Sequence, residues 1–183
     1  MKWLDCVIRD WRIRKAIPQL AKAERVLDVG CGDGELCRCL AKRGATGVGI
    51  DSRLVKPETI TGFEFVSGPF PDSLPVEDLF DVVAMLAVLE HVPEWQKSAW
   101  VEACRVRLVE GGVVVLTVPS PKVDAILAIL RFFRLIDGMA LEEHHGFDPD
   151  AVEPLFISSG FQLVLRKSFQ LGLNNLFVFS KIA

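Results

Sequence analysis

An acid and three alternate glycines stand out in the first third of the sequence, which reads VLDVGCGDGELCRCLA from residue 26 to residue 41. Asp28 is followed by Gly30, Gly32 and Gly34 at every second position. Glycine permits a sharp turn and lets a ligand approach the backbone where a Cβ atom would collide with it. The turn leads into a predicted helix, whose first N–H groups lack partners and would face the ligand. The pattern therefore predicts a ligand-binding turn.

A second acid, Asp51, ends the apolar stretch TGVGID, 21 positions beyond Gly30. This is close to the roughly 20-residue spacing expected for a carboxylate that grips a ribose. Such a carboxylate can accept hydrogen bonds from both sugar hydroxyls, and charge-assisted bonds are the stronger kind. The alternative is that Asp51 only caps the next turn. Ser52, which follows it, belongs to the same candidate binding group.

The spacing of the glycines separates two classes of cofactor. The dinucleotide fingerprint is G-x-G-x-x-G, but the third glycine position is Glu35 here, which makes a nicotinamide oxidoreductase a distant alternative. An acid followed by alternate glycines resembles motif I of class I S-adenosylmethionine (SAM)-dependent methyltransferases. A strand-to-helix turn without a ligand is the other alternative, which the complete string of residues disfavours.

Apolar stretches that read as strands alternate with helical ones through the chain. The strand-like stretches are RVLDVG, TGVGID, GFEFVSG, FDVVAMLAVL and GGVVVLTVP, and the helical ones are ELCRCLAKRG and PEWQKSAWVEACRVRL. This alternation requires crossover connections, so the strands run parallel with helices on both faces. FQLVLRKSF and LFVFSKI then predict a closing antiparallel hairpin. The expected fold is α/β, a Rossmann-like, doubly wound, mostly parallel seven-stranded sheet with an antiparallel last strand.

Two further helices are expected near the ends of the chain. Residues 2–22 have apolar groups at helical spacing, and this helix should break near Pro18. Toward the C-terminus, Asp148 is a candidate N-cap, Pro149 fits the first helical position and Gly160 a helix end. Pro154 lies inside this second helix and should kink or shorten it.

The resemblance extends from Arg25 to Ala183. FDVVAMLAVLEHVPE and GGVVVLTVPS are similar to the fourth and fifth strands of the methyltransferase group that includes ubiquinone-biosynthesis O-methyltransferases. This similarity implies that Leu86 and Ala87 lie beside the methionine portion of the cofactor, and that Cys31 belongs to the binding turn. One departure is SGPFPDSLP, where the acid commonly found near adenine is replaced. Phe70 in that stretch either packs against the adenine or fills the core.

Methyl transfer from SAM requires few catalytic groups on the protein. The sulfonium of SAM already makes the methyl group electrophilic, so the chain must align a nucleophile and exclude water. A base is needed only where the acceptor must lose a proton, and no metal is demanded. His144 and His145 are the candidate catalytic residues, with a solvated loop and a metal site as alternatives. His91, in LEHV, is more readily explained as structural or pocket-lining.

The apolar stretch VDAILAILRFFRLI, residues 123–136, follows the expected fifth strand. It is shorter than the roughly 20 residues of a membrane span and carries three charges. We expect a lid-like insertion over residues 121–147 that covers a lipophilic or aromatic acceptor. Packing in the chain's own core, contact with a membrane surface and contact with a second subunit are the alternatives.

Composition bounds these expectations. The 183 residues are 50% hydrophobic, which predicts one domain over residues 1–183 that begins with a helical segment, residues 1–24. A net charge of −3 makes nucleic acid an unexpected partner. The five cysteines are odd in number and no signal peptide is evident, so a cytoplasmic location is expected. The expected function is methyl transfer from SAM to a small, hydrophobic or aromatic molecule; the alternative is a SAM-binding regulatory or accessory protein. The oligomeric state is left open.

Overall fold

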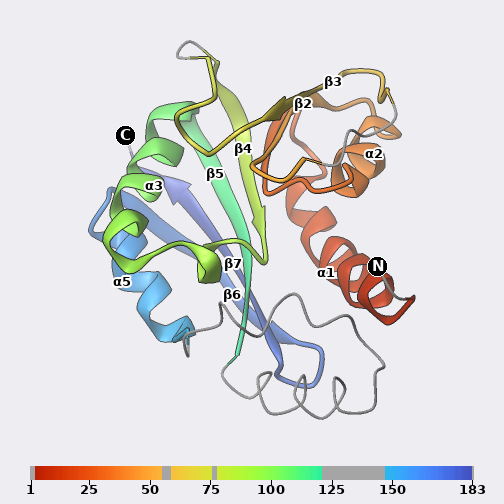
Figure 1. Cartoon of the computed structure of the whole chain (residues 1–183). Helices are drawn as coiled ribbons and strands as arrows, with labels where there is room; N and C mark the ends of the chain where they lie inside the picture. Colours follow the sequence, from red (N-terminus) through yellow and green to blue (C-terminus); the bar gives the residue numbers. More distant parts are fainter. Residues whose placement is uncertain (1–2, 55–58, 76–77, 121–146, 183) are drawn as a thin grey trace.

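A seven-stranded mixed sheet forms the centre of the computed structural model, which describes residues 3–54, 59–75, 78–120 and 147–182 (Figure 1). The strand order is β3-β2-β1-β4-β5-β7-β6. β1 to β5 run parallel, and β7 pairs antiparallel with both β5 and β6. The strands are β1 Arg25–Val29, β2 Thr46–Asp51, β3 Phe63–Ser67, β4 Phe80–Leu86, β5 Leu108–Pro119, β6 Phe161–Phe169 and β7 Asn174–Lys181. The expected doubly wound fold with an antiparallel last strand is confirmed.

Helices cover both faces of the sheet (Figure 1). One face carries α1 and α2, whose apolar residues pack together with Val26, Val82 and Val115 of the sheet. The other face carries α3 and α5, packed around the phenylalanines of β7. The helical elements are α1 Trp3–Leu20, α2 Glu35–Ala41, η1 Leu89–His91, α3 Glu94–Arg107, η2 Pro149–Ala151 and α5 Val152–Ile157.

The first helix departs from its expected end. α1 continues through Pro18 to Leu20 instead of breaking at the proline. A proline removes one backbone hydrogen bond and crowds the carbonyl of the residue four positions earlier, at a cost of about 3 kcal/mol inside a helix. Ile13, Ala16, Ile17 and Leu20 are buried, so the last turn is held against the sheet by its own apolar side chains.

Two other boundaries differ from the expected ones. β5 begins at Leu108, three residues before Gly111, where it already pairs with Phe80 of β4; the register then shifts before Val82. The closing helix starts as a 3₁₀ turn, where the Asp148 side chain accepts a hydrogen bond from the Asp150 N–H, as the N-cap pattern predicts. It ends at Ile157, so the proline at 154 accompanies a short helix.

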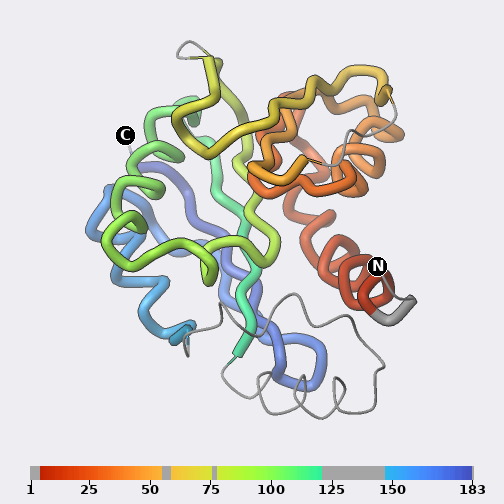
Figure 2. The backbone as a smooth tube through the Cα atoms, viewed as in Figure 1, coloured from red at the N-terminus to blue at the C-terminus, as the bar shows by residue number. Residues whose placement is uncertain are grey.

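The carboxyl ends of the parallel strands meet at one edge of the sheet, where the turn between β6 and β7 also lies, beyond the end of β5 (Figure 2). Ligands of open α/β sheets bind at this edge. Among the described residues, no helix has the length and apolar character needed to cross a membrane. The apolar stretch 123–136 and both candidate histidines, His144 and His145, lie outside the described residues.

Candidate ligand-binding site

The glycine turn directly follows β1 at the carboxyl edge. Gly30, Gly32 and Gly34 have φ angles of +75°, +55° and +76°, the left-handed region that favours glycine. The N–H groups of Gly30 and Cys31 both donate to the Ile50 carbonyl, at 2.8 and 3.2 Å. The turn is therefore fastened to the neighbouring strand β2.

The three glycines serve different purposes. A Cβ atom on Gly30 would lie 2.4 Å from a γ carbon of Val88, and one on Gly34 would lie 3.0 Å from the Phe65 ring. On Gly32, however, a Cβ atom would meet no heavy atom of the described residues within 4 Å. Two glycines thus allow close packing of the protein on itself, and Gly32 leaves open space beside the turn.

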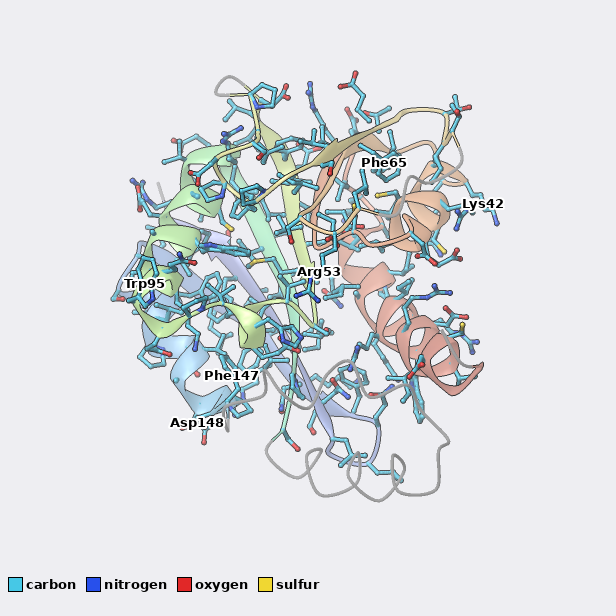
Figure 3. The ribbon with its side chains drawn as sticks, viewed as in Figure 1. Lys42, Arg53, Phe65, Trp95, Phe147 and Asp148 are labelled. Atoms are coloured by element: carbon cyan, nitrogen blue, oxygen red, sulfur yellow. The ribbon has the colours of Figure 1, made fainter. Side chains whose placement is uncertain are left out.

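Asp51 connects the end of β2 to this turn. One of its carboxylate oxygens accepts a hydrogen bond from the Gly32 N–H at 3.0 Å, and the other accepts from the Arg53 N–H at 2.7 Å. Each oxygen keeps a lone pair for a further donor. Arg53 lies between α1 and α3 in the view of Figure 3, and Ser52 is exposed. The pair of oxygens beside open space at Gly32 is suited to a vicinal diol such as a ribose.

Replacing Asp51 with asparagine is expected to weaken SAM binding about 30-fold. The amide keeps one acceptor oxygen and turns an NH₂ group toward a backbone N–H, and hydrogen bonds to charged groups contribute about 1.5–3 kcal/mol each. Isothermal titration calorimetry measures the change. Asp33→Asn is the matched control, since that carboxylate lies in the same turn but pairs with Arg9 at 2.7 Å. Equal losses in both variants would contradict the assignment.

Asp28 is buried beneath the turn. It is 3% exposed, and its Oδ2 atom lies 3.4 Å from the Cys37 sulfur, whose thiol donates to it. Burial raises the pKa of Asp28 to about 7, the Cys37 hydrogen bond opposes this, and the charge of Asp51 adds to it. The pKa of the Cys31 thiol is also raised by burial and by these two acids, so this thiol stays neutral.

The raised pKa of Asp28 predicts a pH-dependent stability. The folded chain holds a proton on this carboxyl between its ordinary pKa of 3.8 and about 7, so the free energy of unfolding falls as the pH rises through that window. From pH 5 to pH 8 the fall should be roughly 3 kcal/mol larger in the wild type than in Asp28→Asn, at 1.36 kcal/mol per unit. Urea denaturation at both pH values measures it. If the free energy of unfolding fell equally in the two proteins, Asp28 would not be the source of the pH dependence.

The end of β4 packs against the glycine turn. Ala87 has a φ of +61° and its N–H donates to the Thr117 carbonyl at 2.9 Å. Its neighbour Val88 is the side chain that fills the space over Gly30. Leu86 is partly buried against the face covered by α1 and α2. The structure thus brings Leu86 and Ala87 to the edge where the turn lies, and their contact with a cofactor stays a prediction.

Phe70 lies in the hydrophobic core, which is one of the two roles expected for it. It is 5% exposed and its ring meets Trp100 edge-on, with centroids 5.0 Å apart and planes at 71°. It belongs to the cluster on the face of α3 and α5. Stacking on an adenine has no support in this arrangement, and adenine contact at Phe70 stays a prediction.

Polar groups that the sequence does not single out gather at the same edge. Glu90, in η1, is 6% exposed, and Thr117, near the end of β5, is fully buried. The Glu90 oxygens, Thr117 Oγ1 and Arg12 Nε are buried without a hydrogen-bond partner in the described part of the chain. The sequence holds a clue to two of these residues. Thr117 interrupts the apolar stretch VVVLTVP, and Arg12 precedes the buried Ala16 by about one helical turn in α1.

Histidine and metal chemistry receive little support from the described residues. His91 ends η1 and is exposed. Within residues 3–54, 59–75, 78–120 and 147–182, no group of three or more His, Cys, Asp or Glu side chains could hold a metal ion.

Known methyltransferases resemble this chain in sequence. Residues 2–165 match the family model described as a methyltransferase domain. A ubiquinone biosynthesis O-methyltransferase of Psychrobacter arcticus is 33% identical over 156 residues, which cover 75% of this chain and 59% of that protein. The same enzyme of Acinetobacter baumannii (strain AYE) is 35% identical over 160 residues, 76% of this chain and 64% of its own length. The chain thus spans less than two thirds of these relatives.

Solved structures share the fold. A Burkholderia thailandensis 1,6-didemethyltoxoflavin-N1-methyltransferase, with 1,6-didemethyltoxoflavin and S-adenosylhomocysteine bound, superposes with a TM-score of 0.71 at 17% identity, over 94% of this chain and 77% of that one. Human N-acetylserotonin methyltransferase in complex with SAM gives 0.70 at 19% identity, over 94% and 52%. By its match to the family model over residues 2–165, the chain belongs to the methyltransferase-domain family.

Proposed function

We propose that this chain is a SAM-dependent methyltransferase that methylates a hydroxyl group of a small, hydrophobic or aromatic molecule. One observation carries the cofactor assignment: Gly32 leaves open space at the turn, and both Asp51 oxygens lie beside it with a lone pair to spare. This cradle fits the sugar of an adenosyl compound held against bare backbone. Membership of the methyltransferase-domain family supports the same cofactor.

The acceptor class is inferred from two lines. The relatives named above are O-methyltransferases of ubiquinone biosynthesis, a name that points to an oxygen acceptor on a lipophilic molecule. The sequence adds the apolar stretch 123–136, for which we expect a covering role toward such a molecule. The location in the cytoplasm and the single-domain organisation of residues 1–183 stay predictions.

The residues would act by position. When bound, SAM supplies a methyl group made electrophilic by its sulfonium. The glycine turn and Asp51 would fix the adenosyl portion, and Leu86 and Ala87 would lie beside the methionine portion. Alignment of an acceptor with the methyl group, away from water, can contribute about 7–11 kcal/mol to lowering the barrier.

The test combines binding with turnover. Purified chain is titrated with SAM by calorimetry, then incubated with SAM and a panel of alkyl-substituted catechols and phenols. We expect binding of SAM, release of S-adenosylhomocysteine and a methyl ether detected by mass spectrometry. Binding with no S-adenosylhomocysteine formed from any acceptor would favour a regulatory or accessory protein. Absence of SAM binding would refute the proposal.

A further inference from the structure

A thiol and a carboxyl group meet in the core beneath the glycine turn. Asp28 of β1 is 3% exposed, and Cys37 of α2 is fully buried. The Cys37 thiol donates to the Oδ2 atom of Asp28 at 3.4 Å. A thiol is a weak donor, whereas a fully buried acid is almost always paired with a partner that holds its charge. This pairing therefore stabilises the charge of Asp28 only weakly.

The groups around Asp28 are neutral or negative. On the β2 side Asp28 pairs with Gly49, and a Cβ atom at that glycine would lie 2.9 Å from the Cys31 sulfur. Burial and nearby acids raise the pKa of the Cys31 thiol, so it stays neutral. In the described part of the chain, the groups that shift the pKa of Asp28 are the Cys37 thiol and the Asp51 carboxylate. Of these two, the thiol favours the ionised form of Asp28.

Three effects set the charge of Asp28. Burial is the largest and raises the pKa to about 7, the Cys37 hydrogen bond lowers it, and the negative charge of Asp51 raises it. Arg9 of α1 also reaches the turn, where it pairs with Asp33 at 2.7 Å. Without the thiol, the two remaining effects both favour the neutral acid. Cys37 thus determines how far the carboxyl is ionised near neutral pH.

A negative charge on Asp28 acts on a ligand held at the glycine turn. Asp28 precedes Gly30 by two residues, and it interacts electrostatically with Asp51, which accepts the Gly32 N–H. SAM carries one more positive charge than S-adenosylhomocysteine, since methyl transfer converts the sulfonium into a neutral thioether. An ionised Asp28 therefore attracts the methyl donor more strongly than the demethylated product.

Resting on the proposed function, we propose that Cys37 is a positioning residue whose thiol keeps Asp28 ionised, and that this charge makes the site prefer SAM over S-adenosylhomocysteine. The preference should rise with pH, because a protonated Asp28 does not distinguish the two ligands by charge. The step is the loss of one proton: the O–H bond of the Asp28 carboxyl breaks, its electron pair stays on the oxygen and the proton passes to the solvent. Above neutral pH, the demethylated product is then exchanged more readily for fresh SAM.

Calorimetric titrations with SAM and with S-adenosylhomocysteine from pH 5 to pH 9 test the inference. The measured quantity is the Kd of S-adenosylhomocysteine divided by that of SAM, and Asp28→Asn corrects it for titration of the ligands themselves. In the wild type, the corrected ratio should rise about tenfold, as expected for unit charges several ångströms apart near a protein surface. In Cys37→Ala the midpoint of this rise should lie about one pH unit higher, since the carboxylate has lost its donor. Cys37→Ser restores a donor and should return the midpoint to the wild-type value or below.

A second readout is the number of protons released on binding, measured by repeating the titrations in buffers of different ionisation enthalpy. At about pH 6.5 the wild type should release about half a proton with SAM and almost none with S-adenosylhomocysteine. Cys104→Ala is the matched control, because Cys104 is also fully buried but lies in α3, on the other face of the sheet. It should leave the midpoint and the proton release unchanged. A general loss of packing would weaken both ligands alike and would not move the ratio.

The possible failures are distinguishable. If the ratio in the wild type followed that of Asp28→Asn at every pH, the inference would be overturned and the proposed function would stand. If Cys37→Ala kept the wild-type midpoint, the positioning role of Cys37 would be overturned. Wild type that binds neither ligand would refute the proposed function instead.

Discussion

Gly32→Val is expected to weaken SAM binding at least about 1,000-fold while the chain stays folded. The valine side chain would fill the space that is open beside the turn, where no heavy atom of the described residues lies within 4 Å of the Cβ position. A ligand seated against bare backbone would lose its place, and a loss of about 4 kcal/mol corresponds to this factor. Calorimetric titration with SAM measures it.

Backbone strain must be separated from this effect. Gly32 has a φ of +55°, so any side chain there costs about 1–2 kcal/mol of stability. Gly44→Val imposes comparable strain, since Gly44 has a φ of +86° and is likewise open within 4 Å, but it follows α2, outside the turn. We expect similar losses of stability in both variants and a loss of affinity in Gly32→Val alone. If Gly44→Val lost as much affinity, strain would be the explanation.

Gly47→Ala should destabilise the fold by more than about 4 kcal/mol, beyond the usual 1–3 kcal/mol of overpacking. A Cβ atom on Gly47 would lie 1.9 Å from the Val26 carbonyl oxygen and 2.8 Å from its carbonyl carbon. These are backbone atoms of β1, the strand that pairs with Gly47 and leads into the binding turn. No rotamer change can relieve the contact, so β1 and β2 would have to separate.

Urea denaturation of Gly47→Ala, or its recovery only from the insoluble fraction, would register this loss. Gly111→Ala is the control, because Gly111 has a φ of +72° and open space within 4 Å among the described residues. It should cost only the 1–2 kcal/mol of backbone strain. If the urea midpoint of Gly47→Ala were as high as that of Gly111→Ala, strands β1 and β2 would tolerate the added methyl group.

The sequence was sufficient for the features that depend on local spacing. Alternate glycines after an apolar stretch predict a turn whatever the rest of the fold, and a strand end 21 positions beyond Gly30 places Asp51 at the same sheet edge. The hydrogen bond from Gly32 to Asp51 joins these two segments. The alternation of strands and helices likewise sufficed for the sheet, whose observed order matches the doubly wound expectation.

Features that depend on tertiary packing could not be predicted from the sequence. LEHV draws attention to the histidine, which is exposed, whereas the adjacent Glu90 is buried. Burial of this glutamate depends on how η1 packs against β5, a strand distant in the sequence, and nothing in the four letters encodes that contact. Phe70 posed the same difficulty, because an aromatic residue after a strand can stack on a ligand or fill the core. Only its contact with Trp100 favours the second.

The fastening of the glycine turn to β2 bears on how a ligand would be received. Ile50 holds two N–H groups of the turn and Asp51 holds a third. The backbone of the turn therefore loses its conformational entropy when the chain folds. Ligand binding then has little backbone entropy left to remove at this turn. The backbone of this turn is therefore preorganised, and a ligand can bind to it with little rearrangement of the turn itself.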